Sequence, residues 1–132
     1  IPPYKKLAKL AHKNNILFIL DAAQISGIIP ISVNDDNIDI FCCAGHKGLY
    51  GPTGTGVMVV NNDILLNTIV EGGTGSNSVS HLQPDIMPDR FESGTPNVQG
   101  IIALGKGIDF INKIGIDNRY KLYCKKNNIL YF

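Results

Sequence analysis

The sequence predicts an α/β fold, with a mostly parallel sheet, flanking helices and one antiparallel strand. Residues 16–20 form a continuous apolar run without polar alternation, which is typical of a strand buried on both faces of a parallel sheet. A second short strand is predicted at residues 38–44, and the 17 residues from Asp21 to Asn37 are long enough for the crossover between parallel neighbours. A third strand, 57–60, follows a connection too short for a helix, so we expect it to run antiparallel to its predecessor.

The first flanking helix is predicted at the start of the chain. Pro2 and Pro3 suit a first helical turn, where a missing N–H costs nothing. The apolar side chains that share a face over the next two turns are Leu7, Leu10 and Ala11, and Asn14-Asn15 ends the helix. A brief helix is expected over residues 64–67, capped by Asn61-Asn62-Asp63.

A longer helix is predicted after an irregular region that runs from Glu71 to Gly94. Thr95 is its expected cap and Pro96 its first helical residue, and Gly115 ends it. Its expected apolar side consists of Ile101, Ile102, Leu104, Ile108 and Ile111. A last, interrupted helix is expected from Asp117 to the end of the chain, with few partners for Leu122, Ile129 and Leu130.

Composition narrows the class of protein. The 132 residues are 44% hydrophobic and 17% charged, enough for one domain with a real core and unlike a disordered tail. A formal charge of +1 gives no field that would recruit nucleic acid or an anionic membrane, so neither partner is expected. Three cysteines cannot all pair, and two are adjacent in an apolar run, which favours reduced thiols in a cytoplasmic protein.

Two side chains could carry chemistry at one end of the sheet. Asp21 follows the first strand, and Lys47 follows the second inside a glycine-rich loop, residues 45–56. Ligands of open α/β sheets bind at the carboxyl ends of the strands, so an acid and an amine converging there fit an anionic cofactor. The alternative is that Asp21 caps the following turn and Lys47 is solvated. The loop is not a Walker loop, because Lys47 precedes the glycines, and not a dinucleotide fingerprint, because it leads into a strand.

Four segments, in this order, resemble the class V aminotransferase superfamily, whose members use pyridoxal 5′-phosphate. Within it the resemblance is closest to cysteine desulfurases and selenocysteine lyases, and it covers about residues 1–116. The segments are Asp21-Ala22-Ala23-Gln24, Gly45-His46-Lys47 with Gly51-Pro52-Thr53-Gly54, Glu71-Gly72-Gly73-Thr74-Gly75, and Phe91-Glu92-Ser93-Gly94-Thr95-Pro96-Asn97.

The resemblance implies a role for five residues. Lys47 would form the Schiff base with the cofactor aldehyde and then shuttle a proton. Asp21 would pair with the pyridinium nitrogen, and Gln24 would donate a hydrogen bond to the phenolic oxygen. His46 and Thr95 would contact the phosphate, Thr95 in the neighbouring subunit's site. His46 is also explained as a hydrogen-bonded loop residue, and Thr95 as a helix cap.

The resemblance also implies a place in a larger enzyme. Residues 1–116 would be the central part of the cofactor-binding large domain of a fold-type-I enzyme, and 117–132 would start the helix toward a C-terminal small domain absent from the chain. The implied reaction converts L-cysteine to L-alanine and an enzyme-bound persulfide, in a homodimer that passes sulfur to an acceptor protein. Another class V aminotransferase or lyase activity, or an inactive truncated remnant, stays open.

One position departs from the family pattern. The residue two before His46 is often Ser or Thr in that family and donates to the phosphate, but it is Ala44 in this sequence. The family's sulfur-accepting cysteine, its substrate-binding arginine and the residue that stacks on the cofactor would lie outside these 132 residues. Cys42 and Cys43 are expected in the core, and Cys124 is expected on the last helix rather than at the site.

Overall fold

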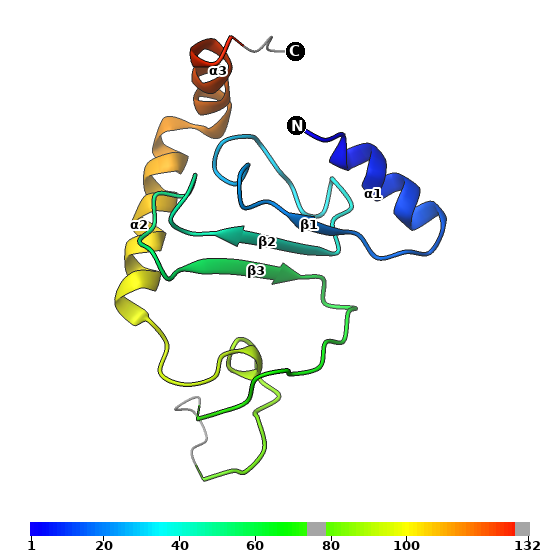
Figure 1. Cartoon of the computed structure of the whole chain (residues 1–132), viewed down its shortest axis with the longest axis vertical. Coiled ribbons are helices and arrows are strands. Elements are labelled where there is room, and N and C mark those ends of the chain that lie inside the picture. The colour runs from blue at the N-terminus through cyan, green and yellow to red at the C-terminus, as the bar shows by residue number, and fades with distance from the viewer. Residues whose placement is uncertain (74–78, 129–132) are drawn as a thin grey trace. The chain divides into compact units, whose positions relative to one another are not determined.

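The computed structural model describes residues 1–73 and 79–128, and they form two compact units. The first unit comprises residues 1–64 and the chain from Gln99 onward, and the second comprises Leu65–Val98. Figure 1 shows the elements of both units along the chain. The two predicted site residues Asp21 and Lys47 both belong to the first unit, which is described first.

The sheet of the first unit has the predicted topology. Its strands are β1 (Ile19–Asp21), β2 (Ile40–Ala44) and β3 (Gly56–Val60), in the order β1-β2-β3 (Figure 1). β1 pairs with β2 in parallel, and β2 pairs with β3 antiparallel. The parallel pair and the antiparallel strand are therefore confirmed, together with the crossover that separates β1 from β2.

The expectation that the first strand is buried on both faces is wrong. Leu20, which is paired with Phe41 of β2, is only 9% exposed, whereas its neighbour Ile19 on the opposite face is 59% exposed. Ile16 and Leu17 are similarly exposed, at 59% and 57%. Within β1 the described residues thus bury Leu20 and leave Ile19 exposed, although Ile40 of β2, which pairs with Ile19, is buried.

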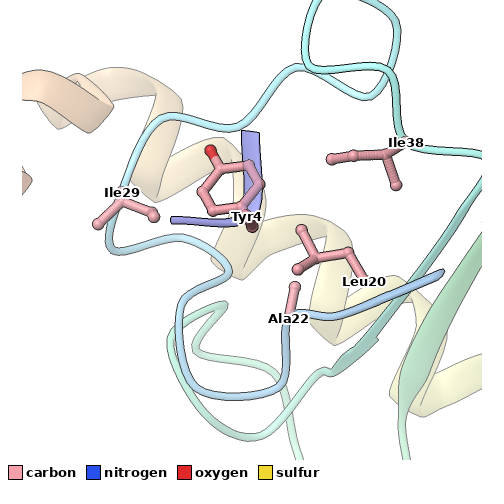
Figure 2. Close-up of a cluster of buried hydrophobic side chains, with 5 residues drawn as sticks. All are labelled: Tyr4, Leu20, Ala22, Ile29 and Ile38. Carbon is pink, nitrogen blue, oxygen red and sulfur yellow. The ribbon is translucent and has the colours of Figure 1, made fainter. Parts of the chain in front are cut away.

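Helix α1 (Tyr4–Lys13) covers the buried face of β1. The predicted apolar face is wrong here, because Leu7 and Leu10 are exposed and the helix buries Tyr4 and Ala8 instead. Figure 2 shows the Tyr4 ring among its partners in the buried cluster. These partners are Leu20, Ala22, Ile29 and Ile38.

A buried carboxylate, Asp36, fixes the start of α1 to the crossover segment. The Tyr4 hydroxyl donates to its Oδ2 at 3.1 Å, and Lys5 Nζ lies 2.8 Å from its Oδ1. Burial by itself would raise the pKa of Asp36, but the hydrogen bonds from Lys5, from the Ser32 backbone and from Tyr4 hold this pKa below its ordinary value. Burial, and then the bond to Asp36, raise the pKa of Tyr4 to about 12.

A second buried carboxylate, Asp39, fixes the end of the same helix. His12 Nε2 lies 2.7 Å from Asp39 Oδ2, and the Phe18 N–H donates to the same oxygen at 2.6 Å. Burial pushes the pKa of Asp39 upward, yet the bonds from Phe18 and His12 bring this pKa below its ordinary value. Each end of α1 is therefore fixed by a carboxylate from one turn region, residues 35–39.

Helix α2 (Val98–Ile114) begins later than predicted. Pro96 is not its first residue, because the Val98 N–H donates to the Pro96 carbonyl in a turn that precedes the helix. Thr95 therefore lies outside the cap position that the sequence predicted for it. The buried face is also narrower than expected: Ile101 and Ile102 are exposed, and the buried residues are Gly100, Leu104, Gly107 and Ile111.

A pocket of about 580 Å³ lies between the sheet and α2. Phe41, Cys43 and Val57 line it from the sheet, and Ile108 and Ile111 line it from α2. The contact between helix and sheet is therefore incomplete, and α2 packs most closely on the loop that follows β2.

Helix α3 (Ile116–Lys126) follows α2 after Gly115, whose φ of +86° is the left-handed conformation that glycine adopts readily. Leu122 is 63% exposed, in line with the expectation that it has few partners, whereas Cys124 is buried. Ile129 and Leu130 lie outside the described residues.

The second unit, residues 65–98, has little regular structure, as predicted for the region between Glu71 and Gly94. Its described element is the 3-10 helix η1 (Asp89–Phe91), and Arg90 forms an ion pair with Asp85 at 2.5 Å. The brief helix predicted over 64–67 is wrong: Asn61 accepts from the Ile64 N–H in a turn, and extended chain follows. Thr74 and Gly75 of the third segment lie outside the described residues.

We predict that Asp36→Asn lowers the free energy of unfolding by about 1–3 kcal/mol at pH 7, because it removes a buried, hydrogen-bonded charge. The pKa of Asp36 lies below its unfolded value of about 3.9, so its contribution is complete above that pH. The contribution is lost as the pH falls through the folded-state pKa, and wild type and variant should converge there. Denaturant titrations between pH 7 and pH 2.5 measure this. Asp35→Asn, one residue away and exposed, is the control; an equal loss in both variants would contradict the assignment.

We predict opposite effects for two glycines of α2. A methyl group on Gly107 would overlap the backbone carbonyl oxygen of Leu49, whereas one on Gly105 meets open space. Gly105→Ala should stabilise the chain by up to about 1 kcal/mol through helix propensity. Gly107→Ala should destabilise it by about 1–3 kcal/mol through overpacking. Thermal or denaturant unfolding measures both variants. A Gly107→Ala variant more stable than wild type would show that α2 does not pack tightly on the loop that contains Leu49.

Candidate functional site

Asp21 and Lys47 lie at the same end of the sheet. Asp21 is the last residue of β1 and is paired with Cys42 of β2. β2 runs parallel to β1 and ends at Ala44, three residues before Lys47. The Ala22 N–H donates to the Cys42 carbonyl at 2.8 Å, which holds the two strand ends together. The topology therefore brings the predicted acid and amine to one edge, as expected for the carboxyl ends of parallel strands.

The Asp21 carboxylate is exposed at the mouth of this edge. Its Oδ1 accepts from the Ala23 N–H at 2.9 Å, so the alternative of a turn-capping aspartate is observed for one of its oxygens. Among the described residues, no hydrogen bond engages Oδ2. One carboxylate oxygen thus orders the turn, and the other can meet a ligand.

An open pocket of about 550 Å³ adjoins Asp21. Sequence reasoning placed Cys42 in the core, but Cys42 is half-buried and lines this pocket beside the carboxylate. Burial raises the pKa of the Cys42 thiol, and the charges of Asp21 and Cys43 raise this pKa further. The lining residues are Asp21, Ala23, Cys42, Cys43, Ala44, Thr55, Gly56, Val57 and Met58.

The segment from Gly45 to Gly51, which we call the lysine loop, is folded into a compact turn. The Gly45 N–H donates to the Thr55 carbonyl at 2.8 Å, and the Gly51 N–H donates to the Gly45 carbonyl at 2.8 Å. The Tyr50 N–H donates to the Lys47 carbonyl at 3.2 Å. These bonds fix the backbone, while the side chains of His46 and Lys47 are exposed. The loop therefore holds the Lys47 backbone firmly and presents its amine outward.

Glycines let other backbone segments approach the lysine loop. A methyl group on Gly27, in the turn after β1, would lie 2.5 Å from the Gly48 carbonyl oxygen, and one on Gly48 would overlap the Ser26 carbonyl oxygen. A methyl group on Gly51 would lie 2.7 Å from a Leu104 methyl of α2. The turn that carries Gln24 and the loop that carries Lys47 are thus in direct backbone contact.

Arg119 of α3 contacts the lysine loop, and no sequence pattern pointed to it. Its Nη1 donates to the Gly48 carbonyl at 2.5 Å, and its guanidinium lies 4.2 Å from the centre of the Tyr50 ring. Tyr50 in turn packs edge-on against Phe110 of α2, with ring centres 5.6 Å apart. Arg119 and Gly48 are 71 residues apart, so local periodicity carries no signal for the contact.

Gln24 and Thr95 belong to different units of the chain. Gln24 is exposed in the helical turn that follows β1, in the same segment as Asp21. Thr95 belongs to the second unit and is exposed. Its contact with a phosphate therefore stays a prediction, as do those of Gln24 and His46.

Two further features bear on the class of site. Within residues 1–73 and 79–128, no group of three or more histidine, cysteine or acidic side chains could hold a metal ion. No helix in that part of the chain is long and apolar enough to cross a membrane.

The chain is similar in sequence to a known family and its members. The sequence model of the family "Aminotransferase class-V" matches residues 1–131. A probable cysteine desulfurase of Pyrococcus abyssi is 38% identical over 117 residues, which are 86% of this chain and 29% of that protein.

Solved structures carry the same likeness. The apo cysteine desulfurase of Thermococcus onnurineus superposes with a TM-score of 0.71 at 32% identity, over 95% of this chain and 33% of that one. The cysteine desulfurase CsdA of Escherichia coli gives a TM-score of 0.78 at 30% identity, over 89% of this chain and 30% of that one. The chain spans about a third or less of these proteins, within their α/β fold. By the family match over nearly its whole length, the chain belongs to the class V aminotransferases.

Proposed function

We propose that this chain is the part of a pyridoxal-phosphate-dependent cysteine desulfurase that supplies the cofactor's anchoring lysine and its aspartate. The observation that carries the proposal is the placement of Asp21 and Lys47 at the carboxyl ends of adjacent parallel strands, β1 and β2. The names of the similar proteins support the same activity. The full reaction would take L-cysteine to L-alanine and leave sulfur on the enzyme.

The residues at this edge of the sheet fit the cofactor. Its ring nitrogen needs an acid, its aldehyde an amine, and its phosphate a set of donors. Asp21 offers a carboxylate oxygen at an open pocket of about 550 Å³, and Lys47 offers an exposed amine on an ordered loop. When bound, the cofactor supplies an electron sink for the substrate's carbanion.

Each site residue would act on a stated atom. Asp21 Oδ2 would accept the ring N–H and keep that nitrogen protonated, while Oδ1 keeps its bond to the Ala23 N–H. Lys47 Nζ would hold the cofactor covalently and then carry the proton between substrate atoms. Gln24 would donate to the phenolic oxygen, and His46 and Thr95 would contact the phosphate.

A homodimer and a sulfur-acceptor protein are part of the proposal. The second unit exposes large apolar side chains, which supports a protein surface that covers them. These side chains are Leu65, Ile69, Val70, Val79, Leu82 and Ile86. We further propose a reducing, cytoplasmic setting, supported by the three free cysteines Cys42, Cys43 and Cys124.

A second class V activity, such as amino transfer or β-elimination, would use the same acid and amine. The observation behind this alternative is Ala44, which lines the pocket at the position where the resemblance implies a phosphate-binding hydroxyl. Assay of a full-length protein carrying this sequence separates the two. Release of alanine from L-cysteine supports the desulfurase, and amino transfer to a keto acid contradicts it.

We predict that pyridoxal phosphate attaches to Lys47. The chain mixed with the cofactor should show the visible absorbance of a lysine-bound cofactor, and borohydride reduction should place the label on the peptide that contains Lys47. Lys47→Ala should abolish the band and the label. Lys106→Ala, which removes an exposed lysine of α2, is the matched control and should keep both. Label spread over several lysines, or an unchanged band in Lys47→Ala, would contradict the site.

We predict that Ala44→Ser tightens binding of the cofactor about tenfold, the equivalent of about 1.4 kcal/mol. The added hydroxyl would stand at the end of β2 and donate a charge-assisted hydrogen bond to the phosphate. Fluorescence titration with pyridoxal phosphate measures the effect. Ala103→Ser adds the same hydroxyl on an exposed turn of α2 and should leave the Kd unchanged; equal Kd values for wild type and Ala44→Ser would place the phosphate elsewhere.

A further inference from the structure

Arg119, on the first turn of α3, holds the residue directly after Lys47. Its Nη1 donates to the Gly48 carbonyl oxygen at 2.5 Å. A charged donor makes this bond stronger than one between neutral groups, and Arg119 is half-buried, so water screens it only in part. Gly48 cannot move in the direction of the turn after β1, because the Ser26 carbonyl already lies against it. The Gly48 peptide is thus held between Ser26 and Arg119.

The same guanidinium also contacts Tyr50, three residues after Lys47. It lies 4.2 Å from the centre of the Tyr50 ring, within the range of a cation–π contact. Tyr50 has a φ of +60°, which is uncommon for a residue with a side chain and persists where the surroundings enforce it. The surroundings are Arg119 on the face of the ring and Phe110 at its edge.

These two contacts hold the turn that follows Lys47 at two points, Gly48 and Tyr50. The Tyr50 N–H closes the turn on the Lys47 carbonyl, so a shift of Tyr50 moves Lys47 directly. The lysine side chain itself is exposed and carries four rotatable carbons. Its amine can return to one place only if its Cα is fixed, and Arg119 holds the turn after Lys47 through Gly48 and Tyr50.

We propose that Arg119 is a positioning residue for Lys47: it acts through the Gly48 carbonyl and the Tyr50 ring to hold the lysine where it bonds the cofactor. The inference rests on the proposed function for the role of Lys47. The fixing of the lysine loop by Arg119 can be measured without the cofactor. Helix α3 would thus take part in the site, although none of the four segments that resemble the family lies on it.

The test uses the chain with Arg119→Met, Arg119→Lys and the control Asn118→Ala. Methionine keeps the apolar stem and removes the charge. Lysine keeps the charge but loses the planar guanidinium that stacks on the ring. Asn118 is the neighbouring residue, and its side chain donates to the Ile114 carbonyl at the end of α2, so its loss removes a local bond that does not involve the lysine loop.

Two readouts separate positioning from simple stability. The first is hydrogen exchange of the Tyr50 and Gly51 amides in the cofactor-free chain, with amides of β2 as an internal reference. Arg119→Met should speed exchange at both loop amides about tenfold and leave β2 unchanged. The second is the rate at which borohydride fixes pyridoxal phosphate on Lys47, which should fall about tenfold. Arg119→Lys should lie between wild type and Met in both readouts, and Asn118→Ala should match wild type.

Unchanged exchange at Tyr50 and Gly51, or faster exchange with an unchanged labelling rate, would overturn the proposal. If Arg119→Met also speeds exchange in β2, the fold itself has loosened and Arg119→Lys decides by the same two criteria. If wild type is never labelled at Lys47, the proposed function fails. The exchange readout then still decides whether Arg119 fixes the loop.

Discussion

Backbone-to-backbone packing around the lysine loop is the constraint on which the rest of the site depends. Gly27 and Gly48 bring the turn after β1 against the loop after β2, and Gly107 brings α2 against Leu49 and Tyr50. A side chain at these positions would keep the segments apart. The glycines therefore allow the turn after β1 and helix α2 to pack directly on the loop that carries Lys47.

The two faces of β1 differ in what lies against them. Leu20 lies on the face that α1 covers, and two buried carboxylates, Asp36 and Asp39, fix that helix at its two ends. Asp21 and Cys42 share a row of the sheet on the opposite face and line an open pocket there. The proposed cofactor site and the buried Leu20 thus lie on opposite faces of β1.

The sequence allowed the strands and their directions to be predicted, because apolar runs and connection lengths determine both. The parallel pair followed from the 17 residues from Asp21 to Asn37, and the antiparallel strand from the short glycine-rich connection at residues 45–56. The burial of β1 on one face only could not be predicted, because the apolar run at residues 16–20 has the same sequence pattern whether one face or both faces are covered. The predicted start of α2 was wrong because the Pro96 carbonyl accepts from the Val98 N–H in a turn ahead of the helix. The contact of Arg119 with Gly48 joins segments 71 residues apart and leaves no local pattern.

We propose that Asp21 and Lys47 meet one cofactor at the carboxyl ends of β1 and β2. A crystal structure of the chain grown with pyridoxal phosphate would show whether they do. We expect continuous electron density between Lys47 Nζ and the cofactor, with the Asp21 carboxylate hydrogen-bonded to the ring nitrogen and the ring in the pocket beside Cys42. Cofactor bound elsewhere, or bound to Lys47 with its ring nitrogen turned away from Asp21, would contradict the claim.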